Sequence, residues 1–263
     1  MAAVTTGSSV TIDPWQPASE ASQALGWSLA LFGFPGVGKT TFSAVPKSLI
    51  VDFEGGTEVI ADRDDVMVWP RRGKDGKLPK ITWDDFMALD RRLRTGNHPF
   101  EVIAFDTASA AQRLTLAKAM KASATPQMPS QPEYGVSNAL LADVIEAWCA
   151  LSRETGITVV FNIHAQEVTE ESGSILIRMA LTPGVTRTIH QSVSSIGYLE
   201  EVRSGVPPNV KIDRKLTLRS TNKVQAKLRQ PLSGPQLPGE MTNPSLVKIL
   251  EFRKTAREER SRA

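Results

Sequence analysis

The sequence contains few of the residues on which several classes of protein depend. Cys149 is the one cysteine among 263 residues, so an internal disulfide is excluded. It ends an apolar run with helical spacing, where a small core side chain is expected rather than a nucleophile. The three histidines show no paired spacing, which argues against a zinc site.

Long apolar runs are also absent from the sequence. No stretch approaches the roughly 20 residues that span a bilayer, and the N-terminus lacks the basic and apolar regions of a signal peptide. We therefore expect no membrane partner and a cytoplasmic location. The composition, with 41% hydrophobic and 22% charged residues, is that of a chain able to bury one large core.

Positive charge is unevenly spread along the chain, although the formal net charge is only +3. Residues 202–230 hold eight lysines and arginines against one acid, Asp213. Such an excess attracts a polyanion by releasing its counterions. A run of charge is also typical of a solvated face, so both interpretations remain open here.

The most informative motif is the octet Gly-Phe-Pro-Gly-Val-Gly-Lys-Thr at 33–40, which follows the apolar run 27–32. It matches the G-x-x-x-x-G-K-T phosphate-binding loop. The glycines let several backbone N–H groups converge on one phosphate, Lys39 adds a charge, and the Thr40 hydroxyl suits Mg²⁺. We predict that the chain binds ATP and Mg²⁺. The predicted nucleotide-binding residues are Gly33, Pro35, Gly36, Val37, Gly38, Lys39, Thr40 and Thr41.

Apolar segments and helical patterns alternate through the first half of the chain, and the second half is rich in strands. Strands are expected at 27–32, 48–53, 100–106, 157–163, 194–202 and 210–218, with a hairpin turning at 172–173. Helices are expected at 39–44, 83–93 (after the N-cap Thr82), 107–121, 137–155, from 186, and at 244–260. A long loop is expected at 122–135.

This order of elements predicts a three-layer α/β fold whose mainly parallel sheet is extended by antiparallel strands. We expect a flexible N-terminal arm at 1–24, a nucleotide-binding core at 25–232, and a linker with a C-terminal helix at 233–263.

Two acids at the ends of strands that we expect to flank the phosphate-binding loop are candidates for the rest of the site. Asp106 ends the strand at 100–106 and is expected to support Mg²⁺, with a helix N-cap as the alternative. Thr107 stands where many ring-forming ATPases carry a glutamate, so the base that activates water is sought elsewhere. Glu54, just past the strand at 48–53, is the candidate general base, and Asp52 is second. A plain turn acid or a surface charge is the competing interpretation of Glu54.

The succession GFPGVGKT, VDFEGG, VIAFDT and VVFNIH resembles the RecA-like recombinase class over about 27–230. It more closely resembles phage proteins described as RecA-like single-strand annealing ATPases, which would place the chain in a bacterial host's cytoplasm. The resemblance implies that Glu54 is the catalytic acid/base, that Asp106 supports Mg²⁺, and that His164 senses the γ-phosphate. RecA itself has glutamine there, and a lone histidine at a strand end is equally consistent with a structural role.

The resemblance also implies two loops that face DNA, at 118–136 and 165–185. Their candidate residues are Lys118, Lys121, Tyr134, Arg178 and, just beyond the second loop, Arg187. Tyr134 would stack on a base, with packing as the alternative. Lys227 and Arg229 are candidates for reaching a neighbouring subunit's γ-phosphate, with solvated charge as the alternative.

The function expected from these features is an ATPase that acts on single-stranded DNA in phage recombination or annealing. It would assemble head to tail and contact other recombination or replication proteins. A small-molecule kinase is an alternative, with Arg91, Arg92 and Arg94 as its lid. A GTPase is weaker, because Gln225 stands where the aspartate of a guanine-reading motif belongs. A nucleotide-dependent scaffold or loader for a protein partner is a third possibility.

Overall fold

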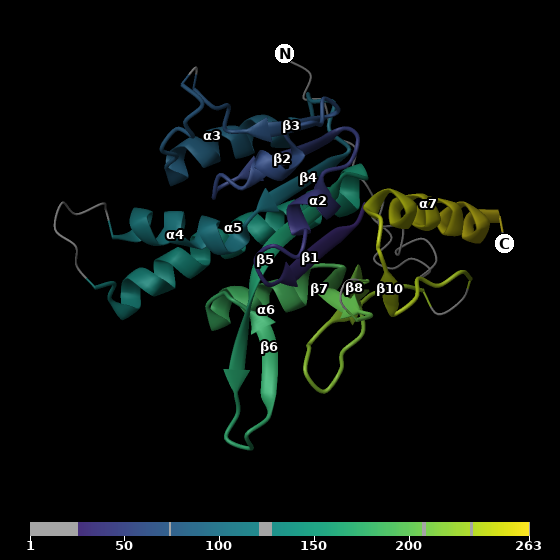
Figure 1. Ribbon diagram of the computed structural model, residues 1–263. Helices are drawn as coiled ribbons and strands as arrows, with labels where there is room; N and C mark the ends of the chain where they lie inside the picture. The colour runs from purple at the N-terminus through teal and green to yellow at the C-terminus, as the bar shows by residue number, and fades with distance from the viewer. Residues whose placement is uncertain (1–25, 74, 121–127, 207–208, 232–233, 263) are drawn as a thin grey trace, which may run out of the picture.

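The computed structural model describes residues 26–73, 75–120, 128–206, 209–231 and 234–262 (Figure 1). The arm expected at 1–24 and Lys121 lie outside these residues. No helix within the described part of the chain is long and apolar enough to cross a membrane.

The expected strands and helices follow each other in the expected order, and β3, β9, β10 and η1 are additional to them. The strands are β1 Ser28–Gly33, β2 Ser48–Asp52, β3 Val66–Trp69, β4 Val102–Asp106, β5 Thr158–Thr169, β6 Ile175–Met179, β7 Ser195–Ser204, β8 Lys211–Thr217, β9 Lys227–Leu228 and β10 Glu240–Thr242. The helices are α2 Lys39–Ser43, α3 Trp83–Arg94, α4 Ala108–Ala119, α5 Gln131–Thr155, α6 Pro183–Ser192 and α7 Leu246–Arg262, with a short 3₁₀ helix, η1, at Thr57–Ile60.

One sheet organises the molecule, with the strand order β10-β8-β7-β1-β5-β4-β2-β3. The neighbours from β7 through β1, β5, β4 and β2 to β3 are parallel. The strands β8, β10, β6 and β9 add to this sheet in antiparallel pairs. The three-layer α/β fold expected from the sequence, a mainly parallel sheet with antiparallel extensions, is confirmed.

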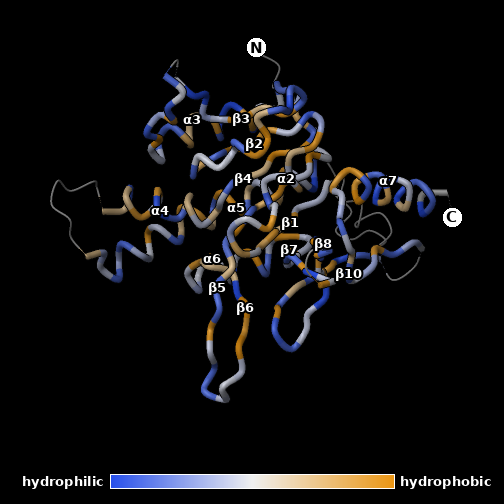
Figure 2. Tube along the Cα trace, in the orientation of Figure 1, coloured by the Kyte–Doolittle hydropathy of each residue, from blue (hydrophilic) through white to orange (hydrophobic). Residues whose placement is uncertain are grey.

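Side chains alternate between two apolar cores because both faces of the central strands are covered. On one face, Phe32, Phe105 and Phe161 pack with α3, α4, α5 and α6. The rings of Phe105 and Phe161 stack with centroids 5.2 Å apart. On the other face, Leu29 and Ile50 pack with α2 and α7. Figure 2 shows the same pattern, with apolar colour gathered in the central strands and hydrophilic colour along most of α7.

Two helices begin earlier than the sequence pattern indicates. Helix α5 begins at Gln131 rather than at 137, because Ser130 and Glu133 form a capping box and a proline occupies the first turn. Residues 131–135 of the loop expected at 122–135 are therefore helical, and 122–127 lie outside the described residues. Helix α6 begins at Pro183 rather than at 186, again with proline in its first turn. The predicted cap of α3 is confirmed, since the Thr82 side chain accepts a hydrogen bond from Asp85 N.

Two hairpins extend beyond the central parallel strands, and Figure 1 shows the one formed by β5 and β6 leaving the body of the molecule. Strand β5 continues to Thr169, beyond the expected end at 163, and pairs with β6 through a turn closed by Glu170 N and Ser174 O at 2.9 Å. Strands β7 and β8 form the second hairpin. Because β1, β5 and β7 are parallel, both hairpins extend from the carboxyl edge of the sheet, where the phosphate-binding octet lies.

Candidate functional site

The octet at 33–40 joins β1 to α2, and its glycines are required by its shape. Gly36 and Gly38 have φ of 82° and 93°, a region that disfavours other residues. A Cβ on Gly33 would stand 2.4 Å from the carbonyl oxygen of Leu199 on β7. Val37 is buried, whereas Pro35 and Gly36 are exposed at the tip. The strand, loop and helix required by a phosphate-binding motif are therefore present.

Lys39 is held at the centre of this loop. Its Nζ donates to the carbonyl oxygens of Gly33 at 2.8 Å and Phe34 at 3.0 Å, and the residue is only 6% exposed. Burial lowers the pKa of Lys39, while the charges of Asp106 and Glu54 act in the opposite direction. The ammonium group thus lies within the field of both acids singled out in the sequence.

Thr40 and Asp106 are in direct contact. The Thr40 hydroxyl donates to Asp106 Oδ2 at 2.7 Å, and Asn162 Nδ2 donates to Asp106 Oδ1 at 3.1 Å. Burial raises the pKa of Asp106, partly offset by these two hydrogen bonds. A hydroxyl beside a carboxylate is the hard oxygen donor set that Mg²⁺ prefers, so the residues fit that ion. The N-cap interpretation of Asp106 is wrong, because Thr107 caps α4 by accepting from Ala110 N.

The strands of the two acids are not the neighbours of β1. We expected Asp106 and Glu54 on strands that flank the loop strand, but β5 and β7 occupy those places and β4 lies beyond β5. Asp106 reaches the loop because Asp52, Asp106 and Asn162 are aligned across β2, β4 and β5. Thr40, at the start of α2, lies over this row.

Glu54 lies just past β2 and has partners from two other elements. His164 Nε2 on β5 is 2.9 Å from its Oε2, and Arg113 Nη2 on α4 donates to Oε1 at 3.1 Å. Partial burial would raise the pKa of Glu54, but His164, Arg113 and the Thr107 hydroxyl together hold it below the usual range. The carboxylate is therefore ionised and fixed, with 26% of the side chain still exposed.

Asp52, the second candidate for the base, has a different task. Its Oδ1 accepts hydrogen bonds from the backbone N–H groups of Glu54 and Gly55, and its Oδ2 accepts from the Thr57 hydroxyl. Both oxygens are thus engaged within one turn. Asp52 thus holds the turn that presents Glu54, and it is buried, whereas Glu54 is partly exposed to the site.

His164 is fixed by its backbone as well as by its ring. It pairs in register with Gly33 of β1, and its N–H donates to Ser109 Oγ at 3.2 Å. Its Nδ1 is buried and has no hydrogen-bond partner among the described residues. The sequence placed His164 at a strand end, which is wrong because β5 continues to Thr169; the structure joins its ring to Glu54.

Two arginines at the site were missed by the sequence analysis. Arg113 belongs to α4 and was not distinguishable from any exposed helical arginine. Arg214, on β8, donates from Nε to the carbonyl oxygen of Val37 at 3.0 Å. A Cβ on Gly38 would stand 2.7 Å from that nitrogen, so the arginine packs directly on the loop. In the sequence, Arg214 stands out only as one of the basic residues of 202–230.

A cavity of about 250 Å³ adjoins the loop on the side of Arg214. Thr41 and Phe42 of α2 line it, together with Arg214, Pro244 and Leu246. Thr41, predicted to bind nucleotide, therefore faces a hollow beside the phosphate loop.

The segments expected to face DNA are not open loops where they are described. Lys118 is on α4 and its Nζ lies 2.7 Å from Asp84 Oδ2, and Tyr134 is in the first turn of α5. Arg178 is on β6 of the projecting hairpin, paired with Glu170 at 3.2 Å. Arg187 is exposed on α6. The range 165–185 is a hairpin followed by the start of a helix.

The basic segment 202–230 does not form one continuous patch. Three of its basic residues pair with acids: Arg203 with Glu201, Lys211 with Asp213, and Lys215 with Glu240. The acids Glu201 and Glu240 lie outside the segment, so the sequence count overstates its net charge. Charges adjacent in sequence are thus divided among several surfaces.

Lys227 and Arg229 are used within the chain. Lys227 Nζ donates to the carbonyl oxygens of His190 and Val193, and Arg229 Nη2 donates to that of Gln191 at 3.0 Å. Both side chains thereby satisfy carbonyl groups at the end of α6. Burial, with the nearby charge of Arg229, lowers the pKa of Lys227 to about 8. Neither side chain is simply solvated.

The residues of the alternative functions lie away from the octet's contacts. Arg91 and Arg92 are exposed on α3, while Arg94 pairs with buried Asp90 at 2.9 Å. The Asn-Lys pair of the guanine-type motif lies in a turn where Thr221 N donates to Val224 O, and Val224 bridges to β6. No contact of these groups with residues 33–40 is seen in the described structure.

Comparison with known proteins gives one family. No curated protein sequence matches the chain. A family model described as an AAA domain matches residues 25–230, which include the loop, Glu54, Asp106 and His164. The matched residues include the strands and helices that position the site. The chain belongs to this AAA-domain family and contains a P-loop NTPase-type domain.

Proposed function

We propose that the chain is a Mg²⁺-dependent ATPase of RecA-like type that acts on single-stranded DNA as a head-to-tail oligomer in phage recombination or annealing. The proposed ATP hydrolysis rests on the position of Glu54 in the structure. Its carboxylate is ionised, fixed by His164 and Arg113, and close enough to Lys39 for their charges to interact.

The proposed reaction is an in-line attack of water on the γ-phosphorus of ATP. Glu54 accepts a proton from that water, a P–O bond forms, and the bond to the β,γ-bridging oxygen breaks to release ADP. Lys39 leaves the carbonyl groups of Gly33 and Phe34 to bind phosphate oxygens. Thr40 and Asp106 would hold Mg²⁺, which would neutralise negative charge on the phosphates.

His164 and Arg113 position the base and can respond to the γ-phosphate. A His164 ring that donates to Glu54 in the free chain can donate instead to a phosphate oxygen, which would change how Glu54 is held. Because β5 continues directly from His164 into the projecting hairpin, a change at this residue reaches that hairpin through one strand. This connection is the proposed link between nucleotide state and DNA binding.

The projecting hairpins support the proposed DNA binding and assembly. They extend from the nucleotide edge of the sheet, and exposed apolar side chains occupy the β7–β8 hairpin, where Val206 is 77% and Ile212 55% exposed. Such side chains are suited to burial against a second copy. The hairpin of β5 and β6, at 165–179, lies within the range 165–185, and the proposal gives it the DNA-facing role that the resemblance implies for that range.

Measuring ATP turnover with and without a single-stranded oligonucleotide tests this function. We expect turnover to need Mg²⁺ and to rise when the oligonucleotide is added, with oligonucleotide binding that weakens as salt increases. Turnover that is unchanged by DNA, together with no salt-sensitive binding, would contradict the DNA part and leave a nucleotide-dependent scaffold.

A further inference from the structure

A second cavity, of about 500 Å³, lies at the opposite end of the sheet from the phosphate loop. Trp27, which precedes β1, and Thr158, which begins β5, line it together with α7 and the segment after β9. Both residues stand at the amino ends of parallel strands, whereas the loop follows the carboxyl end of β1. The cavity is therefore separate from the proposed ATP site.

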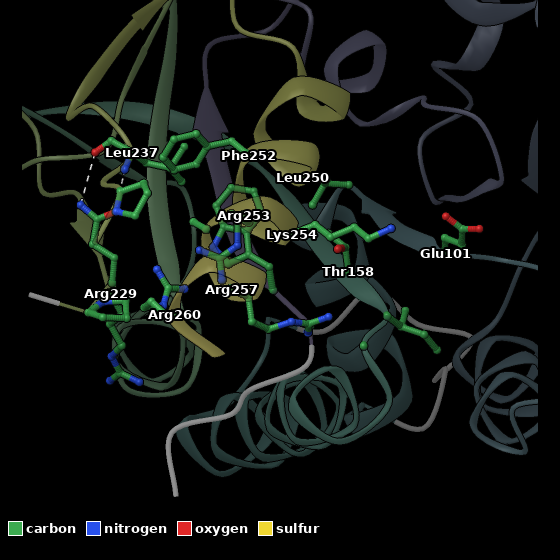
Figure 3. Close-up of a pocket in the computed structure, with 18 of the residues that line it drawn as sticks. Glu101, Thr158, Arg229, Leu237, Leu250, Phe252, Arg253, Lys254, Arg257 and Arg260 are labelled. Carbon is green, nitrogen blue, oxygen red and sulfur yellow. Dashed lines mark hydrogen bonds between the residues drawn. The ribbon is translucent and has the colours of Figure 1, made fainter. Parts of the chain in front are cut away.

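Arginines from two parts of the chain converge on this cavity. Arg253, Arg257 and Arg260 recur at helical spacing on one face of α7, and Arg229, whose Nη2 donates to Gln191 O, lines the cavity from the segment after β9 (Figure 3). All three α7 arginines are partly buried, whereas the acids Glu251, Glu258 and Glu259 of the same helix are exposed. Helix α7 thus turns its positive charge toward the cavity.

Arg253 is close to other positive charges in this arrangement, and its pKa is lowered. Its guanidinium carbon lies 5.0 Å from the centre of the Trp27 ring. Burial, with repulsion from Arg260 and Arg257, lowers the pKa of Arg253 to about 10. Among the described residues that line the cavity, Glu101 is the one acid, and it is paired with exposed Lys47. Figure 3 shows Glu101 well apart from the arginines.

We propose that this cavity is a second anion site, which binds phosphate groups of a nucleic acid strand or of a free phosphate compound. Several guanidinium groups in one hollow suit a ligand with more than one negative oxygen, and arginine matches phosphate geometry with paired hydrogen bonds. The volume is within the range of small-ligand sites. The partly exposed side chains of Leu250 and Phe252 offer apolar surface against which a base or sugar can pack.

The test uses the full chain carrying Lys39→Ala, so that phosphate binding at the octet is weakened. Arg260→Gln is added to remove one cavity charge, and Arg91→Gln, on the exposed face of α3, is the control with the same change in net charge. Arg253→Met is a second cavity variant, because methionine fills much of the arginine's volume over Trp27. The probes are inorganic pyrophosphate and a labelled oligo(dT), each followed by thermal unfolding and by binding titration.

We expect either cavity variant to weaken the affinity for at least one probe about tenfold or more, consistent with the loss of a charge-assisted hydrogen bond. The control should keep its affinity. Loss for oligo(dT) alone identifies a nucleic acid backbone as the source of phosphate, and loss for pyrophosphate alone identifies a free compound. Without any probe, Arg260→Gln should leave the unfolding midpoint unchanged or raise it, because a repulsion is removed.

Two results would overturn the proposal. One is equal affinity for both probes in the cavity variants and the control. The other is a clear fall in the unfolding midpoint of Arg260→Gln without any anion, which would mean that the arginine stabilises the fold. Neither result bears on ATP hydrolysis at the octet, so the proposed ATPase is tested separately.

Discussion

Replacing Glu54 with glutamine separates the role of the base from the binding of nucleotide. Glutamine keeps the size of the side chain and an oxygen that can accept from Arg113, so the turn held by Asp52 should persist. It cannot take a proton from water. A positioned general base contributes about 10²- to 10⁴-fold, which is roughly 3–5 kcal/mol of activation free energy. We expect kcat to fall by that factor and nucleotide affinity to change less than about threefold.

The assay is phosphate release under saturating Mg²⁺ and ATP, with nucleotide affinity measured by equilibrium binding. The pH profile gives an independent readout. Because the pKa of Glu54 is held low, wild-type turnover should decline only below the usual titration range of glutamate. His164→Gln or Arg113→Gln removes a group that lowers this pKa, so the acid limb should move to higher pH. Unchanged kcat in Glu54→Gln would refute the assignment of the base.

Three further predictions concern the stability of the fold and the affinity of the loop for nucleotide. Asp90→Ala should lower the free energy of unfolding by about 2–4 kcal/mol in denaturant titration, because buried Asp90 accepts from Trp148 Nε1 at 2.7 Å and pairs with Arg94. Lys227 has a pKa of about 8 in the folded chain against 10.5 for an unperturbed lysine, so the unfolded chain binds more protons between these pH values. The free energy of unfolding should therefore increase as pH rises from about 8 to about 10. In Lys227→Met this increase should be absent when the midpoint of thermal unfolding is followed against pH. The same pH dependence of the midpoint in both proteins would contradict the prediction. Arg214→Gln should weaken nucleotide binding by about tenfold in equilibrium titration, because a charge-assisted hydrogen bond to the loop carbonyl is lost, and an unchanged affinity would remove Arg214 from the site.

The nucleotide loop could be predicted from the sequence because its determinants are local. The octet needs a strand before it, glycines at positions of positive φ and a helix after it, all within 27–44. The positions of the acids could also be predicted from local sequence. Asp52 and Asp106 end apolar runs, and parallel strands bring their carboxyl ends to one edge.

The sequence pattern did not reveal how distant elements meet. It placed β4 and β2 beside the loop strand, whereas β5 lies between, because strand order depends on crossovers that no single segment encodes. Arg113 and Arg214 reach the site from elements separated by about 100 residues of chain. The sequence around each of them is the same as that around a solvent-exposed arginine, so neither could be assigned to the site. The basic segment was overestimated because its neutralising acid Glu240 comes from β10.

The most direct test of the account is the rate of phosphate release from Mg²⁺-ATP by the unaltered chain and by Lys39→Ala, measured side by side. Lys39 is buried in the loop and interacts electrostatically with both Asp106 and Glu54, so its loss should remove almost all turnover while the fold remains. We predict measurable hydrolysis by the unaltered chain and a reduction of about 10²-fold or more in the variant. Equal rates for the two proteins, or no hydrolysis by either with and without single-stranded DNA, would contradict it.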